Sequence, residues 1–129
     1  MESFTVRTGS RTELLDITAG VEKILNNSRV QEGLCCVFVP HTTASITINE
    51  NADPSVRRDI LAELNKVIPF DDGYTHGEGN SAAHIKASLM GSSVTVPVSG
   101  GRLILGTWQG IYLCEFDGPR SRQVVVTVR

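Results

Sequence analysis

The sequence contains no pair of cysteines with the C-x-x-C spacing that is typical of zinc and redox sites. Its three cysteines, Cys35, Cys36 and Cys114, all lie in apolar runs. Neighbouring side chains of a strand point to opposite faces, so Cys35 and Cys36 cannot easily bind one metal ion together. We interpret all three as reduced, mostly buried thiols that behave as small hydrophobic side chains.

Three further absences narrow the class of protein. No apolar run approaches the ~20 residues of a membrane span, and the opening stretch MESFTVRTGSRTE has no apolar segment of signal-peptide length. The net charge is −2 in 129 residues, and no basic run is interleaved with aromatic residues. We therefore expect a cytoplasmic protein that binds neither membranes nor nucleic acids.

The residues that are present predict one α+β domain over 1–129, with mostly antiparallel sheets, two main helices and one short N-terminal helix. The short helix follows Thr18, and Asp53-Pro54 is a strong start for the second helix, which Pro69 stops. A third helix begins at Asn80 or Ser81 and ends at Gly91. Apolar runs and apolar–polar alternation predict strands over 3–8, 13–18, 34–40, 45–50, 93–98, 102–106, 111–116 and 123–129.

Two expectations concern burial. The run LCCVFVP at 34–40 is continuously apolar, which predicts a strand that is buried on both faces. On the third helix, Asn80, His84 and Ser88 share one polar face because they are four residues apart. Ile85 and Leu89 lie beside that face, and we expect them to anchor the helix to the core.

All three histidines lie in the two most polar and least periodic stretches of the chain. His41 follows Pro40 at the end of a strand, His76 lies in a glycine-rich loop, and His84 lies on the third helix. Three imidazoles with one open position are the pattern of a catalytic zinc site. The alternative is that each histidine caps a turn or bonds a backbone carbonyl, and the spacing alone favours it because no HExxH-like signature is present.

Two carboxylates are candidates for acid–base catalysis. Glu115 interrupts the strand IYLCEF on the face of Leu113, so it is either solvated at a strand end or buried with a partner such as a metal-bound histidine or an arginine. Glu78 lies between two glycines, where the chain can approach a ligand closely. A solvated loop side chain is the simpler interpretation of Glu78.

Three features indicate binding of anions or rings. The run Gly-Glu-Gly-Asn-Ser leads into a helix N-terminus at Asn80 and Ser81, where free N–H groups favour a phosphate. Arg120, like Arg122, follows a turn and could contact phosphate, or it could be an exposed strand-end arginine. Trp108, beside Gln109, can stack on a heteroaromatic ring, although a lone tryptophan is more often part of a core.

Three blocks of the sequence together resemble the YjbQ family: HTTASITINENADPSVRRD, H-x-EGNSAAHIKASLMG and LGTWQGIYLCEFDGPR. The resemblance covers most of the chain, from about Leu34 to the C-terminus. It implies a compact α+β fold, a homotrimer, and a site near subunit boundaries. It also implies a divalent metal at His41, His76 and His84, and imidazole ligands favour zinc over magnesium.

The resemblance further implies an activity, because members of the family are described as secondary thiamine-phosphate synthases. That reaction joins a pyrimidine pyrophosphate to a thiazole phosphate and releases pyrophosphate, and it is regarded as weak. We therefore expect a small metal-assisted enzyme that acts on a phosphorylated heterocycle, with Glu115 and Glu78 as catalytic candidates and with substrate bound by Asn80, Ser81, Trp108, Gln109, Arg120 and Thr43. The alternative is a non-catalytic trimeric protein that binds a metal or a phosphate ligand.

Overall fold

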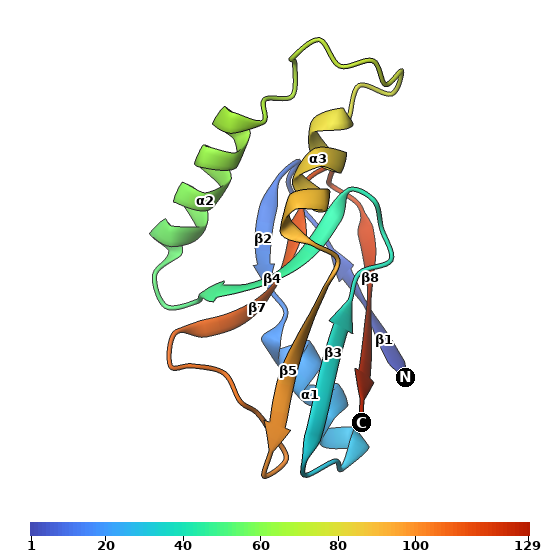
Figure 1. The fold of residues 1–129 in the computed structure, drawn as a ribbon, viewed down its shortest axis with the longest axis vertical. Helices are drawn as coiled ribbons and strands as arrows, with labels where there is room; N and C mark the ends of the chain where they lie inside the picture. The colour runs from blue at the N-terminus through green and yellow to red at the C-terminus, as the bar shows by residue number, and fades with distance from the viewer.

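The computed structural model describes residues 1–129 as a single α+β domain with three helices and two antiparallel sheets (Figure 1). Sheet A has five strands in the order β1-β8-β3-β5-β6, and sheet B has three in the order β2-β7-β4. Along the chain the elements are β1 (Glu2–Arg7), β2 (Glu13–Asp16), α1 (Thr18–Ser28), β3 (Gly33–Phe38), β4 (Ala44–Glu50), α2 (Pro54–Val67), α3 (Ser81–Met90), β5 (Ser93–Ser99), β6 (Arg102–Leu103), β7 (Gln109–Glu115) and β8 (Ser121–Val128).

Two hydrophobic cores lie on the two faces of sheet B. The larger core fills the space between sheet A, helix α1 and one face of sheet B, and it includes Val21 of α1, Val37 of β3 and Leu113 of β7. The smaller core lies between the opposite face of sheet B and helices α2 and α3, and it includes Tyr112 and Phe116. Sheet B is therefore the middle layer of the domain.

The strand that is buried on both faces is β7, not β3. Every residue of β7 from Gly110 to Glu115 is buried, because the alternate side chains of this strand enter the two different cores. In β3, Cys35 and Val37 are buried, but Leu34 is 55 % exposed and Phe38 is 41 % exposed. The prediction that 34–40 is buried on both faces is wrong for the single chain, because no element covers the outer face of sheet A.

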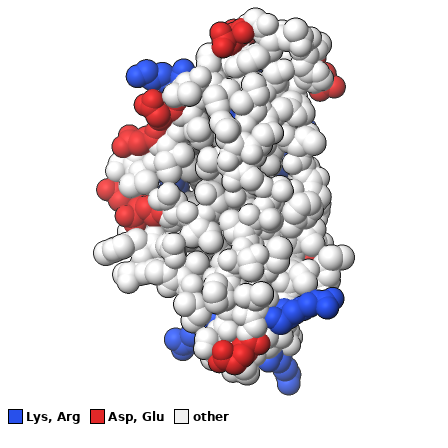
Figure 2. Space-filling model, in the orientation of Figure 1, with Lys and Arg blue, Asp and Glu red and all other residues white.

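The outer face of sheet A carries few charges. It is formed by alternate residues of its strands, among them Leu34, Phe38, Thr95 and Val125. Figure 2, in the orientation of Figure 1, shows Lys, Arg, Asp and Glu gathered toward the margins, while the middle of the view is uncharged. An uncharged sheet face without a covering layer is typical of an interaction surface.

Helix α2 begins as the sequence predicts. Pro54 is its first residue, and the Asp53 carboxylate accepts a hydrogen bond from the Ser55 N–H at 2.9 Å. No residue of α2 is fully buried, so this helix lies over the smaller core only through partly buried side chains such as Ile60 and Leu64. The sequence analysis expected the first helix to be shorter than the other two. Helix α1 has 11 residues and α3 has 10, so α1 is not the shortest helix.

Helix α3 contacts the core through a different face from the one predicted. Ala82, Ala83, Lys86 and Ala87 are its buried residues, whereas Ile85 is 39 % exposed and Leu89 is 69 % exposed. The small alanine side chains let the helix approach sheet B closely, and this leaves the larger aliphatic residues outside. The expectation that Ile85 and Leu89 anchor the helix is wrong.

None of the three helices combines the length and the apolar character that a helix needs to cross a membrane.

Candidate functional site

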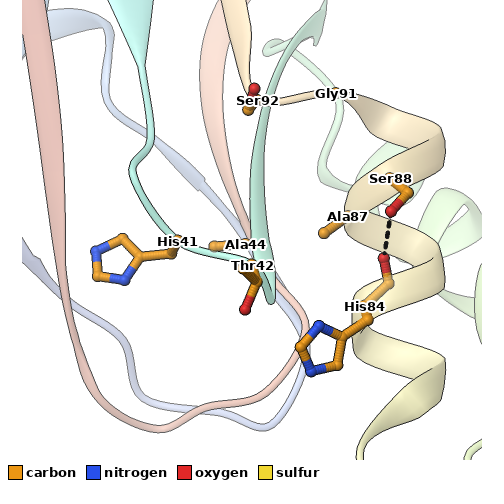
Figure 3. A pocket seen from close by; sticks show the side chains of 8 residues that line it. All are labelled: His41, Thr42, Ala44, His84, Ala87, Ser88, Gly91 and Ser92. Atoms are coloured by element: carbon orange, nitrogen blue, oxygen red, sulfur yellow. Dashed lines mark hydrogen bonds between the residues drawn. The ribbon is translucent and has the colours of Figure 1, made fainter.

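A cavity of about 360 Å³ lies between helix α3 and the segment that connects β3 to β4. Its walls are formed by small and polar residues from these elements and from the turn after α3: His41, Thr42, Ala44, His84, Ala87, Ser88, Gly91 and Ser92 (Figure 3). No lysine, arginine or carboxylate lines it. The cavity therefore offers imidazole and hydroxyl groups, rather than full charges, to a ligand.

Backbone hydrogen bonds hold the two walls of this cavity together. The Ile46 N–H of β4 donates to the Gly91 carbonyl at 3.1 Å, and the Val39 N–H donates to the Ser92 carbonyl at 2.9 Å. Gly91 ends α3 with a φ of 90°, a backbone conformation that residues other than glycine rarely adopt. These contacts fix the C-terminal end of α3 against the start of β4.

His84 and Thr42 provide the polar side chains that point into this space. In Figure 3 the His84 imidazole extends from α3 toward the segment that carries Thr42, whose hydroxyl lies on the opposite wall. Ser88 donates its hydroxyl hydrogen to the His84 carbonyl at 2.8 Å, so its oxygen keeps only lone pairs for a ligand. Thr42 was not among the residues predicted to bind substrate. Its neighbour Thr43 was, but Thr43 is buried and outside the cavity lining.

His41 is held by the neighbouring strand. In the β3–β8 ladder Phe38 pairs with Val125, so the next hydrogen-bonded position would set Pro40 opposite Gln123. The chain leaves the ladder at this point, and the Gln123 N–H instead donates to His41 Nε2 at 2.9 Å. In a neutral imidazole the proton must then lie on Nδ1. The ring projects away from α3 in Figure 3.

The pKa of His41 lies below its ordinary value. Partial burial is the largest cause, and the positive charges of Arg122 and Arg120 add to it, while Glu115 acts in the opposite direction. The neutral form of His41 is thus favoured near neutral pH, which agrees with its role as acceptor for the Gln123 N–H.

His76 lies beside His84. The two rings are perpendicular, with their centroids 5.5 Å apart, and His76 Nε2 is 3.7 Å from Glu78 Oε2 in the exposed loop between α2 and α3. A zinc site needs its ligand atoms about 2 Å from one point. The Nε2 lone pair of His41 accepts the hydrogen bond from the Gln123 N–H, so this nitrogen is not free to bind a metal ion. The chain contains no group of three or more His, Cys, Asp or Glu side chains that could hold a metal ion. The three histidines therefore do not form the predicted site within one chain.

The start of α3 gathers three further residues from the sequence prediction. Asn80 precedes the helix and Ser81 is its first residue, but the Asn80 side chain does not cap the helix; its amide donates to Asp117 Oδ2 at 2.9 Å. Arg120 donates to the same oxygen at 3.0 Å, and its side chain is 49 % exposed. Asp117, which the sequence reasoning did not select, thus holds Arg120 beside the N-terminus of α3.

Glu115 lies in a buried ion pair with Arg122. Arg122 Nε donates to Glu115 Oε1 at 2.9 Å, and Arg122 Nη2 donates to the other carboxylate oxygen. The Thr8 hydroxyl and the Asp117 N–H also donate to Glu115, at 2.8 and 3.0 Å. Arg122 Nη2 further donates to the Thr43 hydroxyl at 2.8 Å and to the Thr43 carbonyl at 3.1 Å. The pair therefore ties β7 and β8 to the segment that carries His41 and Thr42.

These contacts set the charge and the role of Glu115. Burial alone raises the pKa of its carboxyl group, but the hydrogen bonds from Arg122, Asp117 and Thr8 outweigh burial, and the pKa lies below its ordinary value. Glu115 is 0 % exposed. A fully enclosed carboxylate whose pKa is lowered stays ionised at neutral pH and is poorly placed to exchange a proton with substrate, so the structure favours the arginine-paired alternative for Glu115 and argues against a catalytic base.

Trp108 and Gln109 lie at the far end of sheet B from the cavity. In the β4–β7 ladder Ala44 pairs with Glu115, whereas Gln109 pairs with Glu50 at the opposite end of a seven-residue strand, about 20 Å away. Trp108 is 63 % exposed. Within one chain these two residues cannot contact a ligand that is bound beside His84.

Two of the three cysteines, Cys35 and Cys114, are buried, as the sequence predicts, and Cys36 is partly buried. All three cysteines are free. Burial raises the pKa of Cys35 and of Cys114 to about 11, so both remain protonated at neutral pH.

Comparisons with known proteins give a consistent match over the whole chain. The family model described as "UPF0047 protein YjbQ-like" matches residues 2–129. A UPF0047 protein of Methanocaldococcus jannaschii is 50% identical over 97% of this chain and 91% of its own length. The UPF0047 protein YugU of Bacillus subtilis is 50% identical over 95% of this chain and 93% of its own length.

Solved structures match equally well. A crystal structure of a YjbQ/UPF0047 family protein from Clostridium acetobutylicum superposes with a TM-score of 0.99 at 54% identity and covers 100% of both chains. A YbjQ-like protein of unknown function from Sulfolobus solfataricus gives a TM-score of 0.95 at 36% identity, over 98% of this chain and 94% of that one. The fold is therefore the same across these proteins.

Proposed function

The chain belongs to the UPF0047 (YjbQ-like) family, and from this membership we propose that it is a small enzyme that acts on a phosphorylated heterocycle. The heterocycle occupies the uncharged cavity between Thr42 and His84, and its phosphate extends toward the N-terminus of α3. The observation that carries this proposal is the position of His84, whose imidazole lines the cavity and also contacts His76 beside the helix start.

The electrostatics of α3 favour this orientation. The N-terminal end of a helix attracts anions and the C-terminal end repels them. Ala87, Ser88 and Gly91 line the cavity at the C-terminal end, whereas Ser81 and the half-exposed Arg120 lie at the other end. A neutral ring therefore suits the cavity, and a phosphate suits the start of the helix, one turn from His84.

The reaction that we propose to test first is thiamine-phosphate synthesis. In this reaction a carbon of the pyrimidine forms a bond to the thiazole nitrogen, while its bond to the pyrophosphate oxygen breaks and pyrophosphate leaves with the electron pair. The chain would contribute hydrogen bonds from His84 and Thr42 and charge stabilisation of the leaving group by Arg120 and the α3 N-terminus. The expected divalent metal, zinc rather than magnesium, stays a prediction, and no step here depends on it.

Ligand binding tests the two halves of the site separately. We expect His84→Ala to weaken binding of both thiamine phosphate and unphosphorylated thiamine, measured by titration calorimetry. Arg120→Gln should weaken thiamine phosphate about tenfold or more, because it removes one charge-assisted hydrogen bond, and should leave thiamine unchanged. Arg58→Gln, an exposed arginine on α2, is the matched control. Equal affinity of wild type and His84→Ala for both ligands would remove the cavity from the proposal.

A non-catalytic binding protein is the second candidate. It is favoured by the absence of any carboxylate from the cavity wall and by the enclosure of Glu115 in its ion pair. Pyrophosphate release from the pyrimidine pyrophosphate and the thiazole phosphate, measured with excess protein, separates the candidates. Release that is lost in His84→Ala supports the enzyme. Binding of both compounds without release supports the binding protein.

We propose that the protein is a homotrimer whose subunits meet through the outer face of sheet A. The support is the uncharged face with exposed Leu34 and Phe38 and the absence of a covering layer. We expect a solution mass of three 14.0 kDa chains by sedimentation equilibrium, and Phe38→Glu should shift it toward the single chain because it buries an unpaired charge. Val67→Glu adds the same charge on α2, and its mass should stay that of wild type.

A further inference from the structure

A cluster of two cations and one aromatic ring lies at the start of the loop that carries His76. The Arg11 guanidinium carbon is 3.5 Å from the centroid of the Phe70 ring, and Lys86 Nζ is 4.2 Å from the same centroid. Arg11 lies between β1 and β2, Phe70 follows α2, and Lys86 lies in the middle of α3. One ring thus joins three segments that are distant in sequence.

Lys86 is an unusual residue for this position. It is 0 % exposed, and its Nζ donates to Asn65 Oδ1 at 2.6 Å. The ion pairs of the chain involve His76, Arg120 and Arg122, so neither Lys86 nor Arg11 has a carboxylate partner. Burial lowers the pKa of Lys86, and the charge of Arg11 lowers it further. The ring face of Phe70 therefore lies against one exposed cation, Arg11, and one buried cation, Lys86, whose other polar partner is the Asn65 side chain.

The loop from Phe70 to Gly79 has few other attachments to the domain. The Gly79 N–H donates to the His76 carbonyl at 3.1 Å, within the loop, and the Tyr74 hydroxyl donates at 2.8 Å to the carbonyl of Pro69, the residue just before the loop. Ile68, just before the loop, is buried. Phe70 is therefore the loop side chain through which the rest of the protein holds the segment ahead of His76.

We propose that Phe70 is a positioning residue: the cations of Arg11 and Lys86 hold its ring, and this contact seats the loop so that the His76 imidazole lies against His84. The inference concerns the placement of His76, so it stands whether the site is catalytic or only binds ligand. The inference about His76 depends on the proposed function only in an experiment that measures ligand affinity.

Graded fluorination of one ring tests the proposal. Fluorine atoms remove negative charge from the ring face with little change in shape, so they weaken cation–π attraction while leaving packing nearly constant. We would incorporate mono-, di- and trifluorophenylalanine at residue 70 and measure hydrogen exchange of the Gly79 amide and the NOE between the His76 and His84 rings. We expect exchange to accelerate stepwise, on the order of tenfold for the trifluoro ring, and the NOE to weaken in parallel.

Two controls make the result specific. Trifluorophenylalanine at Phe4, which packs against the larger core, should leave the Gly79 exchange rate and the NOE unchanged. In an Arg11→Leu background, where one exposed cation is removed, the dependence on fluorine number should become shallower. Exchange that is independent of fluorination at residue 70, or an equal response at Phe4, would overturn the proposal. Pyrophosphate affinity of the wild-type protein tests the proposed function separately: no measurable affinity would count against the function, while the exchange rate and the NOE would still decide the positioning role.

Discussion

Replacing Glu115 by Gln should lower the free energy of unfolding by about 3–5 kcal/mol, because it leaves the enclosed Arg122 guanidinium without its counter-charge. Arg122 is 2 % exposed and Glu115 is 0 % exposed, so water cannot replace the lost partner. Urea denaturation followed by circular dichroism measures the change. If the variant stays within 1 kcal/mol of wild type, the ion pair does not have the energetic role that its geometry indicates.

The double variant Glu115→Leu/Arg122→Met distinguishes loss of a partner from loss of packing. Removing both charges eliminates the uncompensated cation, so we expect the double variant to be more stable than Glu115→Gln. Glu78→Gln, at a carboxylate whose side chain is 75% exposed, is the control for removing one negative charge and should change stability by no more than about 0.5 kcal/mol.

The same pair determines how the protein responds to acid. The folded-state pKa of Glu115 lies below its ordinary value, so its stabilising contribution is present above the unfolded-state pKa, about 4.3, and is lost as the pH falls through the folded-state value. Unfolding free energies measured from pH 6 to pH 2 should therefore fall more steeply for wild type than for Glu115→Leu/Arg122→Met.

The ion pair could have been predicted from strand alternation. Leu113 and Glu115 share one face of β7, and that face enters the larger core. On β8, Arg122, Val124 and Val126 are alternate residues, so their side chains point to the same face of the strand, and both valines are buried. Two opposite charges on inward-facing positions are expected to pair, because each alone would be costly to bury. The sequence analysis named an arginine among the possible partners of Glu115, but it considered Arg122 only as a phosphate contact or an exposed strand-end residue.

Other features of the site depend on tertiary contacts that have no local signal. The start of α2, with the Asp53 N-cap followed by Pro54, and the end of α3 at Gly91 depend on local sequence, and both were predicted correctly. The orientation of His41 depends on Gln123, which is 82 residues away in sequence. Whether an imidazole faces a cavity or a strand edge is decided by such long-range contacts, and periodicity carries no information about them.

The burial of sheet B leads to the second large expected effect, for Leu113→Ala. Leu113 is 0 % exposed and lies in the larger core, on the strand whose two faces are both covered. Truncation there leaves a cavity that the surrounding layers cannot close, and we expect a loss of about 2–5 kcal/mol in urea unfolding. Leu89→Ala removes the same atoms from α3, where the side chain is 69 % exposed, and should cost less than about 1 kcal/mol. If the two costs were equal, or if Leu89→Ala were the more damaging, α3 would be anchored through its aliphatic residues after all, and the alanine face would not be its contact with sheet B.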